Sequence, residues 1–497
     1  MIESADGYRT DIDYTYGYYG ELNPLRLRLA FLNAGLRAPT IATACELGFG
    51  QGVSLAIHAA ASPTQWHGTD INPAHAGFAR TLAMAAGTQV GIRSESFVDF
   101  SGRDLPAFDY IGLHGIWSWI SDGNRATIVE FVRRHLKPGG VLYTGYNALP
   151  GWAAFSPLRH LLVEHANRPG SEHRLIAERI DDAVAFAERL LATEPAFVHK
   201  NPEILARFNT MKDEDYRYLA HEFFNRDWQP MHFSDVTRRL APAGVSYACA
   251  VDYSDHIDAM GWSGAQRSLI GEIDDATLRE TVRDMIANQR FRRDYWVRGA
   301  TRLSTSERAE ALRHQRVIAV AHPLELPFKV KAALALGQAA PGEAVCGSVL
   351  ERLGDGRAWS LGQIEQALRP KGFSIDQIAR AVVLIASCGL IETAQDDAAT
   401  ARVRSRTDKL NAHLIAVART SGDVHALASP VTGGGISVSR KEQLFLAEAL
   451  QGRTRPDDWA GHAAEVLAAY APVVDLTDAA RAFATDRLPL LRALQVV

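Results

Sequence analysis

Residues 44–55 read ACELGFGQGVSL, in which an acid is followed by glycine at three alternate positions, Gly48, Gly50 and Gly52. The apolar run IATACEL that leads into this stretch is typical of a buried strand, and VSLAIHAAA after it is typical of a helix. Glycine allows a tight turn and lets a ligand lie directly on the peptide groups. The stretch therefore predicts a strand, a ligand-binding turn and a helix.

The spacing of these glycines discriminates between ligands. A dinucleotide fingerprint needs G-x-G-x-x-G. If Gly48 is the first glycine of this pattern, the third should be residue 53, which is Val53 instead. A phosphate-binding loop needs lysine after its last glycine, and Val53 follows Gly52 instead. What remains is E-x-G-x-G-x-G beginning at Glu46, with the first amides of a helix available to a carboxylate. This pattern favours a smaller nucleoside cofactor.

A second acid, Asp70, ends the next apolar segment, QWHGTDI, 24 residues after Glu46. Open parallel sheets bind ligands beyond the carboxyl ends of their strands, where an acid can accept both hydroxyls of a ribose. Enzymes that use NAD have an acid in a similar place, so the glycine spacing and not Asp70 discriminates between cofactors. The alternative interpretation of Asp70 is an N-cap of the helix that begins at NPAHAGFA.

Short apolar runs alternate with helical stretches up to about residue 150. Such alternation predicts a parallel sheet with helices on both faces, an α/β, Rossmann-like architecture. The expected strands are IATACELG (41–48), TQWHGTDI (64–71), VGIRSES (90–96), FDYIGLHG (108–115) and GVLYTGYN (140–147).

The chain of 497 residues is too long for a single hydrophobic core, so several domains are expected. After Pro150 the pattern is mostly helical, although MHFSDVTRRLAPAGVSYACAVDY (231–253) predicts a helix followed by a strand. The expected divisions are a sheet domain with an aromatic N-terminal arm (1–155), a helical domain (156–325), a winged-helix-like segment (326–395) and a C-terminal helical domain (396–497).

The winged-helix-like segment raises the question of DNA binding. Its second helix, SIDQIARAVVLIASCG (374–389), contains a single arginine, Arg380, and is otherwise apolar. A helix that reads a major groove presents polar side chains to base edges. The pattern therefore favours contact with a protein or peptide over contact with DNA.

The composition is that of an ordinary globular protein, with 47% apolar and 22% charged residues and a formal charge of −4. This charge argues against a nucleic-acid partner. Four cysteines without a CxxC pair argue against a disulfide framework or zinc ribbon. No signal peptide and no bilayer-length apolar run is recognisable. We expect a cytoplasmic protein with no membrane partner.

Taken together, four segments resemble the successive motifs of class I S-adenosylmethionine-dependent methyltransferases. The segments are ACELGFGQG, GTDINP, FDYIGLHGIWSW and LKPGGVLYTGYN, and the resemblance covers about residues 15–155. It implies that the glycine turn carries the methionine part of the cofactor, that the acid holds the ribose and that SESFVDF flanks the adenine. The cofactor-binding residues that it implies are Glu46, Gly48, Gly50, Gly52, Asp70, Ile71, Ser96, Phe97 and His114, with Asp99 as an alternative in the adenine region.

A second resemblance covers about residues 165–320. YLAHEFFNRDWQPMHFSDVTRRLAPAGVSYACAVD (218–252) is similar to the methyltransferase regulatory domain, and NQRFRRDYWVRG (288–299) is similar to the segment that follows it. In bacteria this pairing occurs in protein lysine methyltransferases that modify surface proteins. The resemblance implies a protein or peptide acceptor.

Candidate catalytic and acceptor-binding residues cluster at the expected carboxyl edge and in the N-terminal arm. His114 could deprotonate or orient an acceptor, or it could be hydrogen-bonded within the strand turn. Tyrosine offers a cation an aromatic face and a hydroxyl. The catalytic candidates are His114, Tyr16 and Tyr146; the acceptor-binding candidates are Tyr14, Tyr18, Tyr19, Trp117, Asn147 and Arg290. Each tyrosine and tryptophan could instead be part of the core.

Two charged motifs are open to a structural interpretation. Arg290, Arg292 and Arg293 could hold a carboxylate, or they could form a solvated helix face paired with Asp284 and Asp294. The pair His221-Glu222 begins like the zinc motif H-E-x-x-H, but residue 225 is asparagine. We therefore expect no metal, and we interpret the pair as a hydrogen-bonding element of the helical domain.

The sequence thus predicts methyl transfer from S-adenosyl-L-methionine, with S-adenosyl-L-homocysteine as product (an enzyme of class EC 2.1.1). The acceptor is expected to be a protein or peptide, with lysine N-methylation as first choice. The alternative is O-methylation of a carboxylate on a peptide, which includes ribosomally made and modified peptides. An alternative of another class is a non-catalytic cofactor-binding or DNA-binding regulator.

Overall fold

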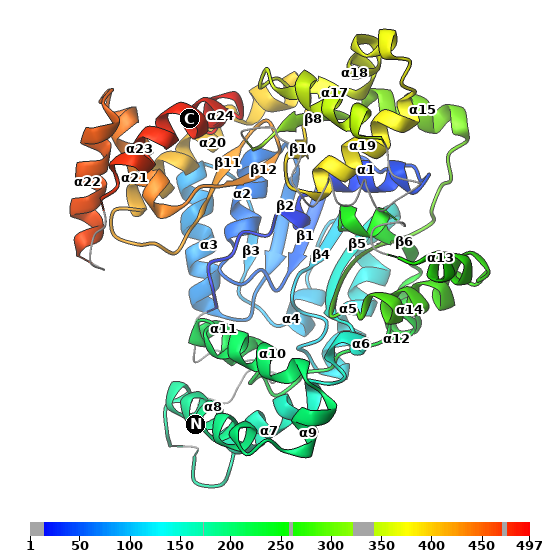
Figure 1. Ribbon diagram of the computed structural model, residues 1–497, viewed down its shortest axis with the longest axis vertical. Coiled ribbons are helices and arrows are strands. Elements are labelled where there is room, and N and C mark those ends of the chain that lie inside the picture. Colours follow the sequence, from blue (N-terminus) through cyan, green and yellow to red (C-terminus); the bar gives the residue numbers. More distant parts are fainter. Residues whose placement is uncertain (1–13, 172, 258–261, 322–341, 470–474) are drawn as a thin grey trace.

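A seven-stranded mixed sheet lies at the centre of the computed structural model, which describes residues 14–171, 173–257, 262–321, 342–469 and 475–497 (Figure 1). The strand order is β3-β2-β1-β4-β5-β7-β6. The first five strands are parallel, and β7 is antiparallel to both of its neighbours. The strands are β1 (Thr43–Leu47), β2 (Gln65–Thr69), β3 (Gly91–Arg93), β4 (Phe108–Leu113), β5 (Leu136–Asn147), β6 (Ser246–Ala250) and β7 (Phe291–Val297).

All five strands expected before residue 150 are present, and the Rossmann-like fold is confirmed. Side chains alternate between the two faces of the sheet, as a strand requires. On β5, Tyr143 packs in the core that contains Phe31, whereas Leu142 and Tyr146 pack in the core that contains Phe131. The helices of the first face are α1 (Arg26–Asn33), α2 (Val53–Ala61) and α3 (Pro73–Ala86), and those of the second are α4 (Phe97–Ser101), α5 (Asp122–His135) and α12 (Phe233–Leu240).

The sheet is not complete at residue 155, where we expected its domain to end. Its last two strands, β6 and β7, come from residues 246–297, which we assigned to the helical domain. The helix and strand expected within 231–253 are confirmed as α12 and β6. The expected helix face around Arg292 is wrong, because these residues form β7; Arg292 is buried and pairs with Asp284 and Asp294 across 2.6 and 2.9 Å.

Residues 149–222, between β5 and α12, form a helical lobe with a hydrophobic core of its own, at the bottom of Figure 1. Its core contains Phe155, Leu162, Ala183 and Phe208. The helices are α6 (Leu149–Trp152), α7 (Ser156–Ala166), α8 (Ile176–Ala192), α9 (Ala196–Lys200), α10 (Glu203–Lys212) and α11 (Tyr216–Glu222); α13 (Gly264–Gly271) and α14 (Ala276–Ala287) follow between β6 and β7.

The segment expected to be winged-helix-like is not confirmed as that fold, and its expected start at residue 326 lies outside the described residues. Its small sheet has the order β10-β8-β9, and the central strand comes from upstream of the segment. Helix α19 has nine buried residues, so its apolar face is not available to a DNA groove. The elements are α15 (Thr305–His314), β8 (Arg316–Ala319), α17 (Glu343–Leu353), β9 (Trp359–Ser360), α18 (Leu361–Ala367), α19 (Ile375–Ser387) and β10 (Ile391–Thr393).

The C-terminal region packs directly on the sheet domain. Helix α20 (Asp397–Val417) lies against α2 and α3, and the hairpin of β11 (Ala426–Ser429) and β12 (Gly434–Ser437) contacts α2 (Figure 1). Every residue of α2 is therefore buried. The last helices are α21 (Arg440–Leu450), α22 (Pro456–Ala468), α23 (Thr477–Ala482) and α24 (Leu488–Ala493). Within the described ranges, no helix has the length and apolar character needed to cross a membrane.

Candidate active site

The glycine turn between β1 and α2 has a left-handed backbone at all three glycines. The φ angles are +71° at Gly48, +56° at Gly50 and +70° at Gly52, a region that other residues adopt only at a cost. A Cβ atom at Gly48 would lie 2.3 Å from Cδ1 of Ile116, and one at Gly52 would lie 2.5 Å from Cβ of Ala79. Both positions therefore exclude a side chain for steric as well as conformational reasons.

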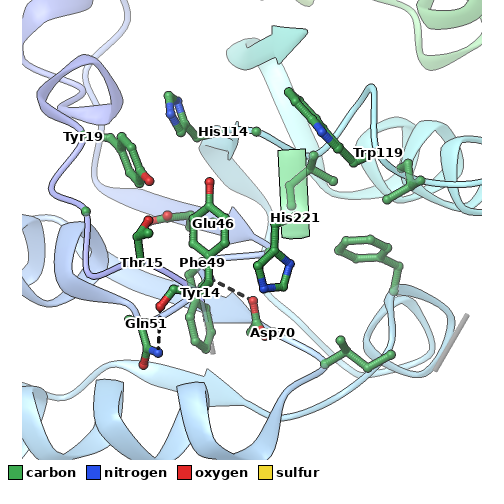
Figure 2. A pocket seen from close by; sticks show the side chains of 18 of the residues that line it. Tyr14, Thr15, Tyr19, Glu46, Phe49, Gln51, Asp70, His114, Trp119 and His221 are labelled. Atoms are coloured by element: carbon green, nitrogen blue, oxygen red, sulfur yellow. Dashed lines mark hydrogen bonds between the residues drawn. The ribbon is translucent and has the colours of Figure 1, made fainter. Parts of the chain in front are cut away.

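A pocket with about 1000 Å³ of empty space lies at the carboxyl ends of β1, β2 and β4 (Figure 2). Glu46 lies at the centre of this view, with Tyr19 and His114 above it and Asp70 below. Eight of the nine residues that we expected to bind the cofactor line the pocket: Glu46, Gly48, Gly50, Asp70, Ile71, Ser96, Phe97 and His114. Gly52 is not among its lining residues; it precedes α2 and allows α3 to approach closely.

The Glu46 carboxyl group is buried in the wall of this pocket. Its Oε2 atom has no hydrogen-bond partner among the described residues. Burial, with a smaller contribution from the neighbouring Asp70, raises the pKa of Glu46 to about 8. A buried acceptor that faces a cavity in this way suits a donor brought by a ligand, because leaving it unpaired costs free energy.

Asp70 connects the glycine turn to the end of β2. Its Oδ2 accepts a hydrogen bond from the Gly50 amide at 2.8 Å, and its Oδ1 accepts one from the Asn72 amide at 3.0 Å. The side chain of His75 lies 3.2 Å from Oδ1. The alternative role of Asp70 as a helix cap is wrong, because Asn72 caps α3 by accepting from the Ala74 amide.

Ser96 and Phe97 reach the pocket at the start of α4. The Ser96 hydroxyl accepts from the Asp99 amide at 3.1 Å and donates to the Asp99 carboxylate at 2.7 Å, so it serves as the N-cap of α4. Neighbouring Glu95 also lines the pocket, while its carboxylate is paired with Arg103 at 2.8 Å. These hydrogen bonds fix the wall of the pocket next to Ile71.

The N-terminal arm covers the pocket with Tyr14, Thr15, Gly17 and Tyr19. Tyr14 and Tyr19 line it, and the Tyr19 ring stacks on His114 at a centroid distance of 4.0 Å. Tyr16 and Tyr18 face away: Tyr16 packs edge-on against Phe78, and the Tyr18 hydroxyl accepts from the amide of Gly435 in the C-terminal hairpin at 2.6 Å. The expected catalytic role of Tyr16 and the expected acceptor contact of Tyr18 do not fit this placement, because neither side chain lines this pocket or the one next to it.

Two further candidates are part of the core. Tyr146 is fully buried and donates a hydrogen bond to the Asp294 carboxylate at 2.7 Å, so a catalytic role does not fit its placement. Trp117 is fully buried in the layer that contains Phe131 and is not among the lining residues of the pocket; Trp119 lines it instead. The side chains of Tyr146 and Trp117 both lie in the core layer between the sheet and α5.

His114 lies at the end of β4 with both a stacking and a hydrogen-bonding partner. Its Nδ1 atom is 2.7 Å from the Tyr143 hydroxyl. Burial lowers the pKa of His114 to about 4, and nearby Glu21 opposes this shift only in part. The ring is therefore neutral at neutral pH, and its position beside Tyr19 places it between the arm and the sheet.

A second pocket, with about 1490 Å³ of empty space, adjoins the first. It extends toward the helical lobe and contains Asn147 and Arg290, two of the expected acceptor-binding residues. The residues shared by both pockets are Tyr14, Thr15, Tyr19, His114, Gly115, Trp119 and Glu222, and those of the second pocket alone include Trp152, Arg207, Glu214 and Tyr218.

His221 and Glu222, which we interpreted as structural, lie in the wall of the first pocket, and Glu222 also lines the second. The Tyr14 hydroxyl donates to Oε1 of Glu222 at 3.3 Å, and the Tyr14 ring meets the His221 ring edge-on at 5.1 Å. Burial raises the pKa of Glu222 to about 8. The only sequence pattern that could have marked these two residues as part of the site is the group of aromatic and acidic side chains in YRYLAHE. Nothing in that stretch indicates that it contacts the distant N-terminal arm.

No group of three or more histidine, cysteine, aspartate or glutamate side chains that could hold a metal ion occurs in the described part of the chain. The site thus consists of an acid- and glycine-lined pocket at the carboxyl edge of a Rossmann-like sheet, joined to a larger aromatic and charged pocket. This arrangement is typical of an enzyme that brings a nucleoside cofactor and an acceptor together at a sheet edge.

Comparisons with known proteins agree with this assignment. Family models described as a methyltransferase domain and a predicted methyltransferase regulatory domain match residues 44–140 and 215–298. The uncharacterised protein sll1526 of Synechocystis is 34% identical over 511 residues, covering 99% of each chain. The uncharacterised protein RP789 of Rickettsia prowazekii is 26% identical over 43% of this chain and 41% of its own. The chain belongs to the family of class I methyltransferases with a methyltransferase regulatory domain, and it is an S-adenosylmethionine-dependent enzyme.

The fold has a counterpart among solved structures. PKMT2 from Rickettsia typhi, solved in complex with AdoHcy, superimposes with a TM-score of 0.67 at 17% identity, covering 98% of this chain and 100% of its own. A second structure of PKMT2 from Rickettsia typhi gives the same TM-score over 97% of this chain. The accessory regions and the sheet domain of this chain therefore share one overall arrangement with PKMT2.

Proposed function

We propose that this methyltransferase acts on the ε-amine of a lysine side chain in a protein or peptide. The observation that carries the proposal is the wall of the second pocket, where the carboxyl groups of Glu214 and Glu222 accompany the rings of Tyr19, Trp119 and Tyr218. Carboxylates and aromatic faces both attract a cation, and burial against the aromatic rings lowers the pKa of an amine toward the neutral form that can react.

We propose that the first pocket holds the cofactor. The unpaired Oε2 of Glu46 suits the ammonium group of its methionine part, and the glycine turn leaves room for a ligand on the peptide groups of Gly48 and Gly50. Asp70 would hold the ribose, and Ile71 and Phe97 would offer apolar surface to the adenine; all three line the pocket. Bound S-adenosylmethionine supplies an electrophilic methyl group on a sulfonium.

The resemblance of residues 165–320 to bacterial protein lysine methyltransferases supports a protein acceptor, and the fold shared with PKMT2 agrees with it. The helical lobe of residues 149–222 supplies Trp152, Tyr218 and Glu222 to the second pocket, so we assign acceptor binding to this lobe. The cytoplasmic location expected from the sequence stays a prediction.

Methylation of a peptide carboxylate is the second candidate. Arg207 and Arg290 line the same pocket, and arginine can orient a carboxylate with two parallel hydrogen bonds. The Arg207 guanidinium, however, lies 3.9 Å from the Trp152 ring centroid and donates to the Gly151 carbonyl at 3.0 Å. These contacts already occupy part of its hydrogen-bonding capacity.

The test is to incubate the protein with methyl-tritiated S-adenosylmethionine and an extract of the organism's own proteins. Acid hydrolysis and amino-acid analysis then separate methyl-lysine from a methyl ester, which releases labelled methanol in base. We expect acid-stable methyl-lysine, and no label above background with heat-inactivated enzyme. Label found only as base-labile ester would refute lysine methylation and favour the second candidate.

A further inference from the structure

Glu222 occupies the junction of the two pockets. It ends α11 of the helical lobe, within the part of the chain that matches the regulatory domain, and it lines both cavities. His114 of the sheet domain and Tyr14 and Tyr19 of the arm also line both pockets at this junction. Figure 2 shows His221, the preceding residue of the same helix, turned toward Tyr14 and Asp70. A residue of the lobe thus reaches the place where cofactor and acceptor would meet.

Within the part of the chain that the structure describes, no cation is paired with Glu222. Among the described residues Glu222 forms no ion pair, and its recorded side-chain hydrogen bond comes from the Tyr14 hydroxyl. Of the two arginines in the second pocket, Arg207 lies on the Trp152 ring, and the side chain of Arg290 is exposed. A partly buried carboxylate without a cation is costly, and an ammonium group brought by a substrate would offset that cost.

The structure assigns to Glu222 a role in the proposed reaction: we propose that its carboxylate receives the acceptor lysine's ammonium group and takes a proton from it. This inference rests on the proposed lysine methylation. Among the described residues, no other carboxyl group lines both pockets. The proposal therefore makes a residue of the so-called regulatory domain part of the catalytic machinery.

The proton and electron balance is simple. The ammonium gives one proton to a Glu222 carboxylate oxygen, which leaves a neutral amine with a free electron pair. A nitrogen–carbon bond to the methyl group then forms while the carbon–sulfur bond breaks, and its electron pair stays on sulfur. The methylated product is again a cation, and Glu222 returns its proton to solvent. Burial also brings the pKa of Glu222 to about 8, closer to that of an amine than an exposed carboxyl group would be.

The experiment compares Glu222→Gln with Glu188→Gln, using the tritium assay described above on the same protein extract. Glu188 lies on α8 of the same lobe, is exposed and forms a surface pair with Lys212 at 2.8 Å, so its substitution removes an equal charge outside both pockets. We expect Glu222→Gln to lower methyl-lysine formation about 100-fold, the usual contribution of a proton-transfer group. Glu188→Gln should stay within twofold of the wild type.

Two further measurements separate this role from a structural one. AdoHcy binding by calorimetry should change less than threefold in Glu222→Gln, because the cofactor pocket keeps Glu46 and Asp70. Glu222→Asp keeps the negative charge at a shorter reach, and we expect it to recover at least a tenth of the wild-type rate even if the glutamine variant folds poorly.

The outcomes distinguish this inference from the proposed function. If the wild type forms methyl-lysine and Glu222→Gln forms it at more than a third of that rate, the inference is overturned and lysine methylation stands. The same holds if Glu222→Asp binds AdoHcy normally and is as inactive as the glutamine variant. If the wild type forms only methyl ester, both are overturned.

Discussion

The two pockets of this enzyme differ in how their walls are assembled. The first is built mainly from the ends of consecutive strands within residues 46–120, whereas the second draws on the N-terminal arm, β5, the helical lobe and residues 290–291. The proposed cofactor pocket is therefore mainly a local feature of the chain. The acceptor side depends on contacts between segments that are far apart in sequence, so the two sides should respond differently to substitution.

The sharpest way to separate the pockets is Asp70→Asn. Asp70 accepts from the Gly50 amide and is placed to hold the ribose, and each hydrogen bond to a charged group contributes about 1.5–3 kcal/mol. We expect AdoHcy affinity, measured by calorimetry, to fall roughly 30- to 100-fold. An affinity within threefold of the wild type would show that the first pocket does not hold the ribose at Asp70.

Gly52→Ala tests whether the glycine outside the pocket acts through packing alone. The new Cβ would meet Ala79 of α3 at 2.5 Å, in addition to the cost of a left-handed backbone. We expect a loss of about 3 kcal/mol in the free energy of unfolding, from overpacking plus backbone strain. The matched control is Gly35→Ala, where φ is +73° and no atom lies within 4 Å of the new Cβ, so only about 1 kcal/mol should be lost. Equal losses in chemical denaturation would contradict the packing role.

Glu46 makes the stability of the first pocket depend on pH. Its pKa is about 8 in the folded protein and near 4.5 in the unfolded chain, so folding takes up a proton between these values. Stability should therefore fall as pH rises from about 5 to 8, by roughly 3–4 kcal/mol more in the wild type than in Glu46→Gln. Thermal melts of both proteins across this range provide the measurement, and parallel curves would show that Glu46 is ionised when folded.

Arg290→Gln gives the smallest effect and discriminates between acceptors. Removing a positive charge from the second pocket should favour an incoming ammonium, so the KM for lysine-containing protein should fall about twofold. If the acceptor were a carboxylate, KM should instead rise at least about tenfold, because a charge-assisted hydrogen bond would be lost. Initial rates at several acceptor concentrations decide between the two.

The sequence predicted those parts of the site whose residues are close together along the chain, because a short sequence pattern there determines the local backbone geometry. Glu46, Gly48, Gly50 and Asp70 occupy a strand–turn–helix unit and the end of the next strand, where spacing alone fixes their position. Gly52 belongs to the same local pattern but does not line the pocket, and its close contact, Ala79, lies on another helix, which the pattern does not indicate.

What could not be predicted depended on tertiary contacts. The chain after residue 150 gave little sign that β6 and β7 return to the sheet, since ninety-eight residues separate β5 from β6 and charged residues fill β7. The tyrosines of the arm stand out in the sequence as a group, but tyrosine content does not specify which of them line the pocket. Tyr16 packs against Phe78 and Tyr18 binds Gly435, contacts that only the tertiary structure provides. Glu222 gained its position only through packing of the lobe against the arm.

Hydrogen bonds between the N-terminal arm and the β11–β12 hairpin link the first and last regions of the described chain. Tyr18 is bound to Gly435, and the Asn23 amide donates to the Thr432 carbonyl at 3.0 Å, so the strip that carries Tyr14 and Tyr19 is anchored more than four hundred residues downstream. Shortening the protein to its Rossmann core in search of a minimal enzyme would remove that anchor and leave one side of the donor cavity unsupported.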